Sequence, residues 1–96
     1  MALDQLIIEK RGDILAAARR HGASKMRVFG SMARGDAGPG SDVDFLVDLE
    51  PGRDLFDLGA LLMDLQDLLQ RKVETVTEAA LHHRIRDHIL EEAVTL

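Results

Sequence analysis

Two aspartates, Asp42 and Asp44, occupy alternate positions at the start of an apolar run in the segment SDVDFLVDL. Alternate residues of a strand point to the same face, so these carboxylates would lie roughly 6.6 Å apart along it. A carboxylate in the middle of a strand is costly to bury unless it is paired or bound to metal. Mg²⁺ prefers carboxylate oxygens together with substrate phosphates. The pair therefore predicts a metal site for phosphoryl transfer, in which two ions hold the attacking and leaving oxygens.

A Gly-Ser turn, Gly30-Ser31, follows the preceding apolar stretch. Glycine lets the backbone approach a ligand closely, and amides at the start of a helical turn point at anions. The Ser31 hydroxyl adds a donor, and Arg34 adds a positive charge that can pair with phosphate oxygens. We also place Ser41, directly before the first aspartate, among the nucleotide-binding candidates. The alternative for Arg34 is pairing with an acid of the loop.

A two-metal site normally needs a third carboxylate, and the sequence offers two candidates. Asp48 shares the face of Asp44 but lies roughly 13 Å further along the strand, which is too far to share an ion. Glu74, in the run KVETV, would lie roughly 4.8 Å away if its strand is a neighbour. We therefore predict Glu74 as the third metal ligand and as the general base that takes the acceptor's proton. A solvated surface residue is the alternative for Glu74.

The hydrophobic periodicity predicts the elements that must position these residues. In chain order we expect a helix over 3–20, a strand over 25–30, a loop over 31–41 with one helical turn near Ser31, a strand over 42–49, a helix to about Gln70, a strand over 73–76 and a last helix. Asp54 and Asp57 form a capping box for the second long helix. Thr77 is expected to cap the last helix, whose buried stripe would be Leu81, Ile85, Ile89 and Ala93. This order predicts one domain, 1–96, of mixed α/β class, with a three- to four-stranded sheet flanked by helices.

Composition narrows the possible partners. The chain has 12 basic and 17 acidic residues, a formal net charge of −5 and no cysteine. Nucleic-acid binding depends on Lys and Arg neutralising phosphates, so direct binding to nucleic acid is not expected. The absence of cysteine excludes disulfides and thiolate metal sites. Because no apolar run approaches a membrane span, we expect a cytoplasmic protein without a membrane partner.

The sequence contains two other patterns of possible metal ligands, an Asp-rich loop and a group of histidines. A calcium loop starting at Asp36 would need a bidentate Glu at its twelfth position, where the chain has Val47. His82, His83 and His88 could suggest a metal cluster, but adjacent residues of a helix do not face each other. We therefore expect these histidines at the surface or in contact with a partner.

The spacing Gly30-Ser31, ten intervening residues, then Asp42-x-Asp44 resembles the nucleotidyltransferase signature of the DNA polymerase β superfamily. The local form GSMARG…SDVDFLV is similar to the minimal nucleotidyltransferase (MNT) subfamily, and the resemblance extends over nearly the whole chain. It implies a polymerase β-like core and Mg²⁺-dependent transfer of a nucleoside monophosphate from NTP to a hydroxyl. By position, Ser31 would bind phosphate, Asp42 and Asp44 would bind metal, and Glu74 would be the third carboxylate.

Proteins of the MNT subfamily are typically antitoxins, and this implies a specific partner. The resemblance implies that the chain uses ATP to adenylylate a tyrosine of a HEPN-domain ribonuclease toxin, which silences the toxin. A protein acceptor also suits a chain of 96 residues, which has no room for the template- or acceptor-binding domains of larger relatives. Two alternatives stay open: neutralisation by stoichiometric binding with a vestigial site, and transfer to a small molecule.

Overall fold

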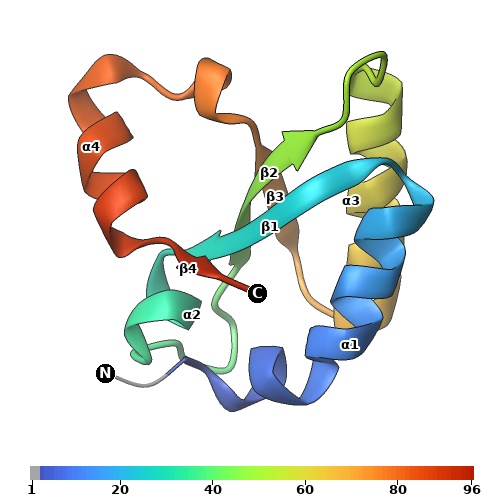
Figure 1. The fold of residues 1–96 in the computed structure, drawn as a ribbon. Helices are drawn as coiled ribbons and strands as arrows, with labels where there is room; N and C mark the ends of the chain where they lie inside the picture. Colours follow the sequence, from blue (N-terminus) through green and yellow to red (C-terminus); the bar gives the residue numbers. More distant parts are fainter. Residues whose placement is uncertain (1–2) are drawn as a thin grey trace.

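The computed structural model describes residues 3–96. Its elements follow one another as shown in Figure 1: α1 (Gln5–Arg20), β1 (Ala23–Phe29), α2 (Ser31–Arg34), β2 (Val43–Leu49), α3 (Leu55–Leu69), β3 (Val73–Val76), the 3₁₀ helix η1 (Glu78–Ala80), α4 (His83–Glu92) and β4 (Val94–Thr95). No helix in this part of the chain is both long and apolar enough to cross a membrane.

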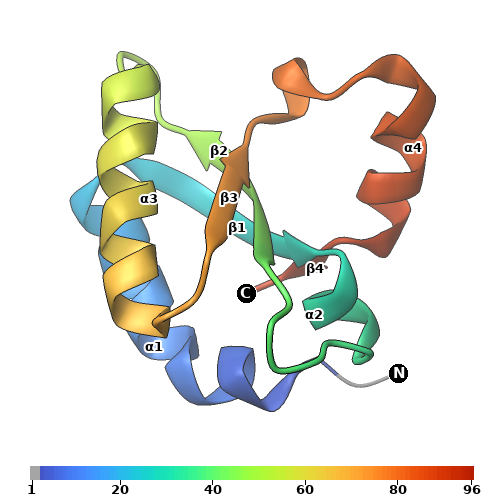
Figure 2. The same ribbon diagram turned by 180° about the vertical axis from the view of Figure 1, so that it is seen from behind.

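The four strands form one mixed sheet in the order β3-β2-β1-β4. β1 is antiparallel to both β2 and β4, whereas β2 and β3 are parallel and are joined by α3. Helices α1 and α3 lie side by side over one face of the sheet, and α4 lies on the opposite side (Figures 1 and 2). The predicted mixed α/β class with a flanked three- to four-stranded sheet is therefore confirmed.

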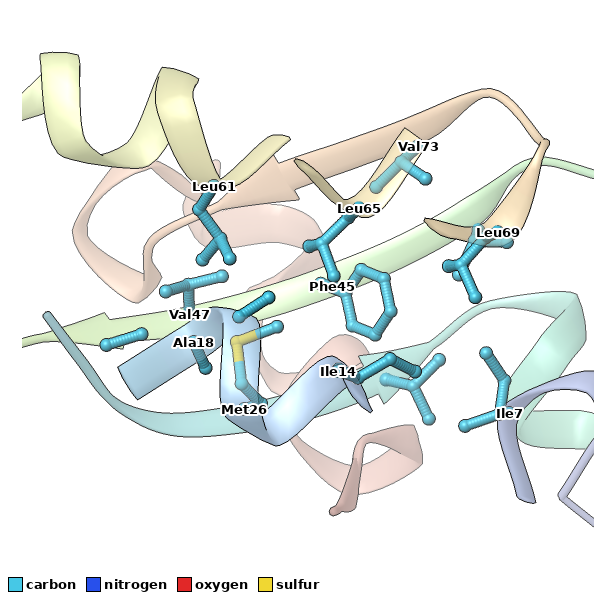
Figure 3. Packing of buried hydrophobic residues seen from close by; sticks show 14 of the residues in the cluster. Ile7, Ile14, Ala18, Met26, Phe45, Val47, Leu61, Leu65, Leu69 and Val73 are labelled. Atoms are coloured by element: carbon cyan, nitrogen blue, oxygen red, sulfur yellow. The ribbon is translucent and has the colours of Figure 1, made fainter. Parts of the chain in front are cut away.

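Alternation along β2 places Val43, Phe45 and Val47 on one face and the aspartates on the other, where Leu46 is also buried. Val43, Phe45 and Val47 are fully buried among side chains of α1 and α3, including Leu61 and Leu65 (Figure 3). Because successive side chains of a strand point to opposite faces, this packing directs the aspartates of β2 to the face away from α1 and α3. The hydrophobic core thus fixes the orientation of the predicted site.

The start of α3 is set by the predicted capping box. The Asp54 carboxylate accepts hydrogen bonds from the amides of Phe56 and Asp57, and the Asp57 carboxylate accepts from the Asp54 amide. These contacts satisfy amides that have no partner within the helix. The helix ends before Gln70, which takes the left-handed conformation with φ of 54°.

The C-terminal part differs from the prediction. Thr77 precedes only the short η1, and the following Leu81 is extended, so α4 begins at His83 instead. His82 supplies the cap, because its Nδ1 accepts a hydrogen bond from the Arg84 amide at 3.2 Å. As a result the expected buried stripe is wrong: Ile89 is buried, whereas Ile85 is 50% exposed and Leu81 and Ala93 are partly buried.

Candidate active site

The Gly30 turn joins β1 to α2 and lies against Asp44. Gly30 has φ of 75° and ψ of −155°, a conformation that is essentially restricted to glycine. Its carbonyl accepts hydrogen bonds from the amides of Ala33 and Arg34 and so starts the single helical turn that was expected near Ser31. A Cβ atom at Gly30 would lie 2.6 Å from Asp44 Oδ2. The glycine therefore brings the Ser31-bearing turn directly against a predicted metal ligand.

Strand register brings Asp44 and Glu74 together. Asp44 pairs with Phe29 of β1 on one side and with Glu74 of β3 on the other. In-register residues of a parallel pair share a face, so Asp44 and Glu74 lie beside each other across the ladder. Asp42 lies just before β2, with Oδ2 3.9 Å from Lys72 Nζ. The condition set for Glu74, that the VETV strand lies next to β2, is therefore met.

The electrostatics of Asp44 reflect this crowding of carboxylates. Partial burial raises the pKa of Asp44, and repulsion from Glu74, Asp42 and Glu92 raises it further, while Arg34 acts in the opposite direction. A group with a raised pKa holds its negative charge at a cost in free energy. A divalent cation next to Asp44 would relieve that cost, which suits the oxygen ligands that Mg²⁺ requires.

The predicted metal ligands Asp42, Asp44 and Glu74 do not form a ready-made metal site in the structure. Among residues 3–96, no three carboxylate or imidazole side chains lie close enough together to hold a metal ion as they stand. The Asp42 side chain is 42% exposed and Glu74 is exposed, so both have room to rotate toward Asp44. The carboxylate oxygens of Asp42, Asp44 and Glu74 are the type of ligand that Mg²⁺ prefers. Their role as its ligands stays a prediction.

Arg34 is occupied by two acids. Its Nε lies 3.1 Å from Asp36 Oδ2 and its Nη1 lies 2.5 Å from Glu92 Oε1. These partners raise the pKa of Arg34, with the hydrogen bond to Glu92 as the larger cause. The same Glu92 carboxylate accepts a hydrogen bond from the Gly30 amide at 3.1 Å through Oε2. Arg34 therefore pairs with an acid of the loop, Asp36, which was the alternative given for it. Phosphate binding by Arg34 stays a prediction.

Sequence reasoning missed Glu92. It lies 62 positions after Gly30 and enters the site only because the end of α4 returns to β1 through β4. The sequence shows only two adjacent acids, Glu91 and Glu92, at the end of a polar helix. No local spacing distinguishes the partly buried Glu92 from its exposed neighbour Glu91.

Ser41 lies in the loop that leads to β2. Its hydroxyl oxygen accepts a hydrogen bond from the Gly38 amide at 2.8 Å, and its carbonyl accepts one from Arg71. These contacts give Ser41 a role in shaping the loop before Asp42. Its role in nucleotide binding stays a prediction.

Comparison with known proteins identifies the family. The nucleotidyltransferase domain family matches residues 13–96. The chain belongs to this nucleotidyltransferase family. The nucleotidyltransferase is 36% identical over 94 residues to the protein adenylyltransferase MntA of Thermococcus cleftensis, covering 93% of this chain and 95% of that protein. It is also 35% identical over 88 residues to a candidate protein adenylyltransferase of Methanocaldococcus jannaschii, covering 92% and 95% of the two chains.

Solved structures agree on the fold. A candidate minimal nucleotidyltransferase shares 43% identity and superimposes with a TM-score of 0.85, covering 100% of this chain and 97% of that chain. A toxin–antitoxin crystal structure with AMP-PNP has a TM-score of 0.74 at 19% identity, covering 88% of this chain and 69% of that chain, and is similar in fold. The resemblance to minimal nucleotidyltransferases is therefore confirmed.

The raised pKa of Asp44 predicts that replacing it stabilises the metal-free nucleotidyltransferase. A carboxyl group whose folded-state pKa lies above its unfolded value loses stability as pH rises between the two values. Above the folded-state pKa of Asp44 this loss is complete, so Asp44→Asn should raise the melting temperature in the presence of a chelator. Below the ordinary aspartate value of 3.8 the difference between the two proteins should disappear.

Thermal unfolding followed by circular dichroism at both pH values measures this effect. Asp48→Asn is the matched control on the same strand, because the Asp48 carboxylate lies 3.0 Å from Arg27 Nη2 in a favourable pair. We expect no rise in melting temperature for this control. An equal rise for both variants would show that net charge, and not the site, is responsible.

Proposed function

We propose that this nucleotidyltransferase is an antitoxin that transfers AMP from ATP to a tyrosine hydroxyl of a cognate HEPN ribonuclease toxin and thereby neutralises it. The observation that carries the transferase activity is the packing of the Gly30-Ser31 turn against Asp44, which itself lies beside Glu74. Two relatives with more than a third of their residues in common, over nearly their full length, carry the name protein adenylyltransferase. One chain of a toxin–antitoxin crystal structure with AMP-PNP has a similar fold over 69% of its length.

Each residue of the site has a defined task in this proposal. Asp42, Asp44 and Glu74 would hold the Mg²⁺ ions, which neutralise phosphate charge and polarise the phosphoryl oxygens when bound. The Ser31 hydroxyl donates a hydrogen bond to a phosphate oxygen, and Arg34 and Ser41 add further donors. Glu74 accepts the proton of the acceptor hydroxyl. The acceptor oxygen then bonds to the α-phosphorus while the α–β phosphate bond breaks and pyrophosphate leaves.

A protein acceptor fits the surroundings of this site. Glu74 is exposed, and its strand β3 is an edge strand of the sheet, so a docked partner could present a hydroxyl beside it. The acidic chain suits a basic protein partner, with electrostatic attraction favouring encounter. We place this reaction in the cytoplasm, where ATP and Mg²⁺ are available and no membrane or nucleic-acid contact is needed.

A direct test is to incubate the chain with Mg-ATP and the product of the adjacent gene, and then to measure the mass of that partner. The proposal predicts that the partner gains one or more AMP groups on tyrosine and loses its ribonuclease activity. Peptide mapping identifies the modified residue. An unmodified partner that is nevertheless inhibited would contradict the enzymatic mechanism.

Stoichiometric inhibition is the second candidate function, and one observation favours it. Among the described residues no three acidic side chains converge on a metal position, and Arg34 is already neutralised by Asp36 and Glu92. A vestigial site would look the same, with the fold serving only to cover the toxin. In that case Asp42→Ala and Asp44→Ala variants would still neutralise the partner without changing its mass.

A further inference from the structure

We propose that the Glu92 carboxylate is an internal substitute for nucleotide phosphate, and that nucleotide binding releases Glu92 and the end of α4 from the Gly30 turn. The inference rests on the proposed function, because it concerns access of ATP to the same donors. In this proposal the segment that carries Glu92, α4 with the following β4, controls the access of ATP to the site.

The contacts of Glu92 are those expected of a bound anion. One carboxylate oxygen accepts a hydrogen bond from the Gly30 amide and the other pairs with Arg34 Nη1. The Glu92 side chain is only 10% exposed, whereas its partner Arg34 is 45% exposed, so the contact with the Gly30 amide is the better shielded of the two. A backbone amide has one hydrogen to donate. A phosphate oxygen can therefore bind the Gly30 amide only after the Glu92 carboxylate has left it.

Charge gives a second reason for release. Glu92 and Asp44 both lie against Gly30, and their negative charges repel each other. A triphosphate brought to the same turn adds further negative charge, and like charges at short range in a partly dry site are strongly unfavourable. Moving Glu92 into water removes one of these charges from the site, and Arg34 becomes available to the phosphate.

The segment that carries Glu92 is weakly held. Among the side chains of α4 only Ile89 is buried, whereas α1 buries Ile7, Ile14, Ala17 and Ala18. The helix is followed by β4, which has only two residues. Segments with few buried apolar contacts open at the lowest free-energy cost. Displacing Glu92 therefore requires only local opening of α4 and leaves the core intact.

Equilibrium binding of a non-hydrolysable ATP analogue with Mg²⁺ tests the inference. We expect Glu92→Gln to bind the analogue about tenfold or more tightly than the wild type, because the competing internal charge is gone. Glu91→Gln is the matched control, since it removes the same charge from the adjacent, exposed position. It should bind within about twofold of the wild type, as expected for a screened surface charge.

The outcomes separate this inference from the proposed function. Equal or weaker binding by Glu92→Gln than by the wild type would overturn the gating role and leave the transferase proposal intact. If neither the wild type nor Glu92→Gln binds the analogue, the proposed use of ATP by this protein is contradicted. If Glu92→Gln does not fold, hydrogen exchange of the wild type decides: the analogue should speed exchange of the amides of residues 84–92, and unchanged or slower exchange there would refute release.

Discussion

Replacing Asp44 with Asn should reduce AMP transfer by about a thousandfold or more. The substitution keeps the size of the side chain but removes the carboxylate that lies between Glu74 and the Gly30 turn. A metal ion contributes several kcal/mol to charge stabilisation in the transition state, and each 1.36 kcal/mol is about a factor of ten in rate. The rate is measured as AMP incorporated into the partner per unit time at saturating Mg-ATP.

Asp48→Asn serves as the control for this experiment as well. It makes the same chemical change four residues further along β2. We expect its transfer rate to stay within a few-fold of the wild type. The variant Asp44→Asn should at the same time be the more stable protein without metal, as argued from the raised pKa of Asp44. A lower activity accompanied by a lower melting temperature would instead indicate that the substitution had damaged the fold.

Replacing Gly30 with Ala should damage both stability and activity. The backbone of Gly30 lies in a region where other residues cost about 1–3 kcal/mol. In addition, the new Cβ would lie 2.6 Å from Asp44 Oδ2, so either the turn or the carboxylate must move. We expect a lower free energy of unfolding, measured with urea, and about a hundredfold or greater loss of AMP transfer, since misplacement by about 1 Å can have that effect.

Gly40→Ala is the matched control, because no atom lies within 4 Å of its added Cβ and its backbone is not in the left-handed region. This variant should keep both the wild-type activity and stability. Normal activity of Gly30→Ala would mean that the contact between the turn and Asp44 is not needed for transfer. The central observation behind the proposed activity would then be lost.

The sequence predicted those parts of the fold that depend on local periodicity and on capping. The alternate positions of Asp42 and Asp44 predicted that both leave one face of the strand, and the box formed by Asp54 and Asp57 placed the start of α3. Both signals depend on residues within a few positions of each other. They were therefore sufficient to predict the mixed α/β class, whereas the pairing of β3 with β2, which the role of Glu74 required as a condition, depends on long-range contacts.

The C-terminal part was harder to predict for a physical reason. Thr77 is a good helix cap by type, but the chain forms only η1 there, and His82 supplies the cap of α4. Strand β4 has two residues, too few for any periodicity, and exists because the edge of β1 offers partners at Arg27 and Val28. The position of Glu92 depends on this long-range pairing, so the occupied Gly30 amide could not be foreseen.

The geometry of the site was predicted only in part. Register places Glu74 beside Asp44, but strand register does not fix the side-chain rotamers, and the three acids do not form a metal-holding group among the described residues. Spacing alone could not show that Arg34 is shared between Asp36 and Glu92. The metal-binding roles of Asp42, Asp44 and Glu74 accordingly depend on the experiments above.

Two backbone hydrogen bonds near the ends of the described chain affect how the protein can be handled. The Asp4 amide donates to the Met32 carbonyl of α2 at 2.9 Å, and the Leu96 amide donates to the Met26 carbonyl of β1 at 2.9 Å. Affinity tags or fluorophores joined close to Asp4 or Leu96 would therefore pull on the segments next to the Gly30 turn. The exposed turn at Pro51-Gly52, beyond the opposite end of β2, is the better position for a reporter group.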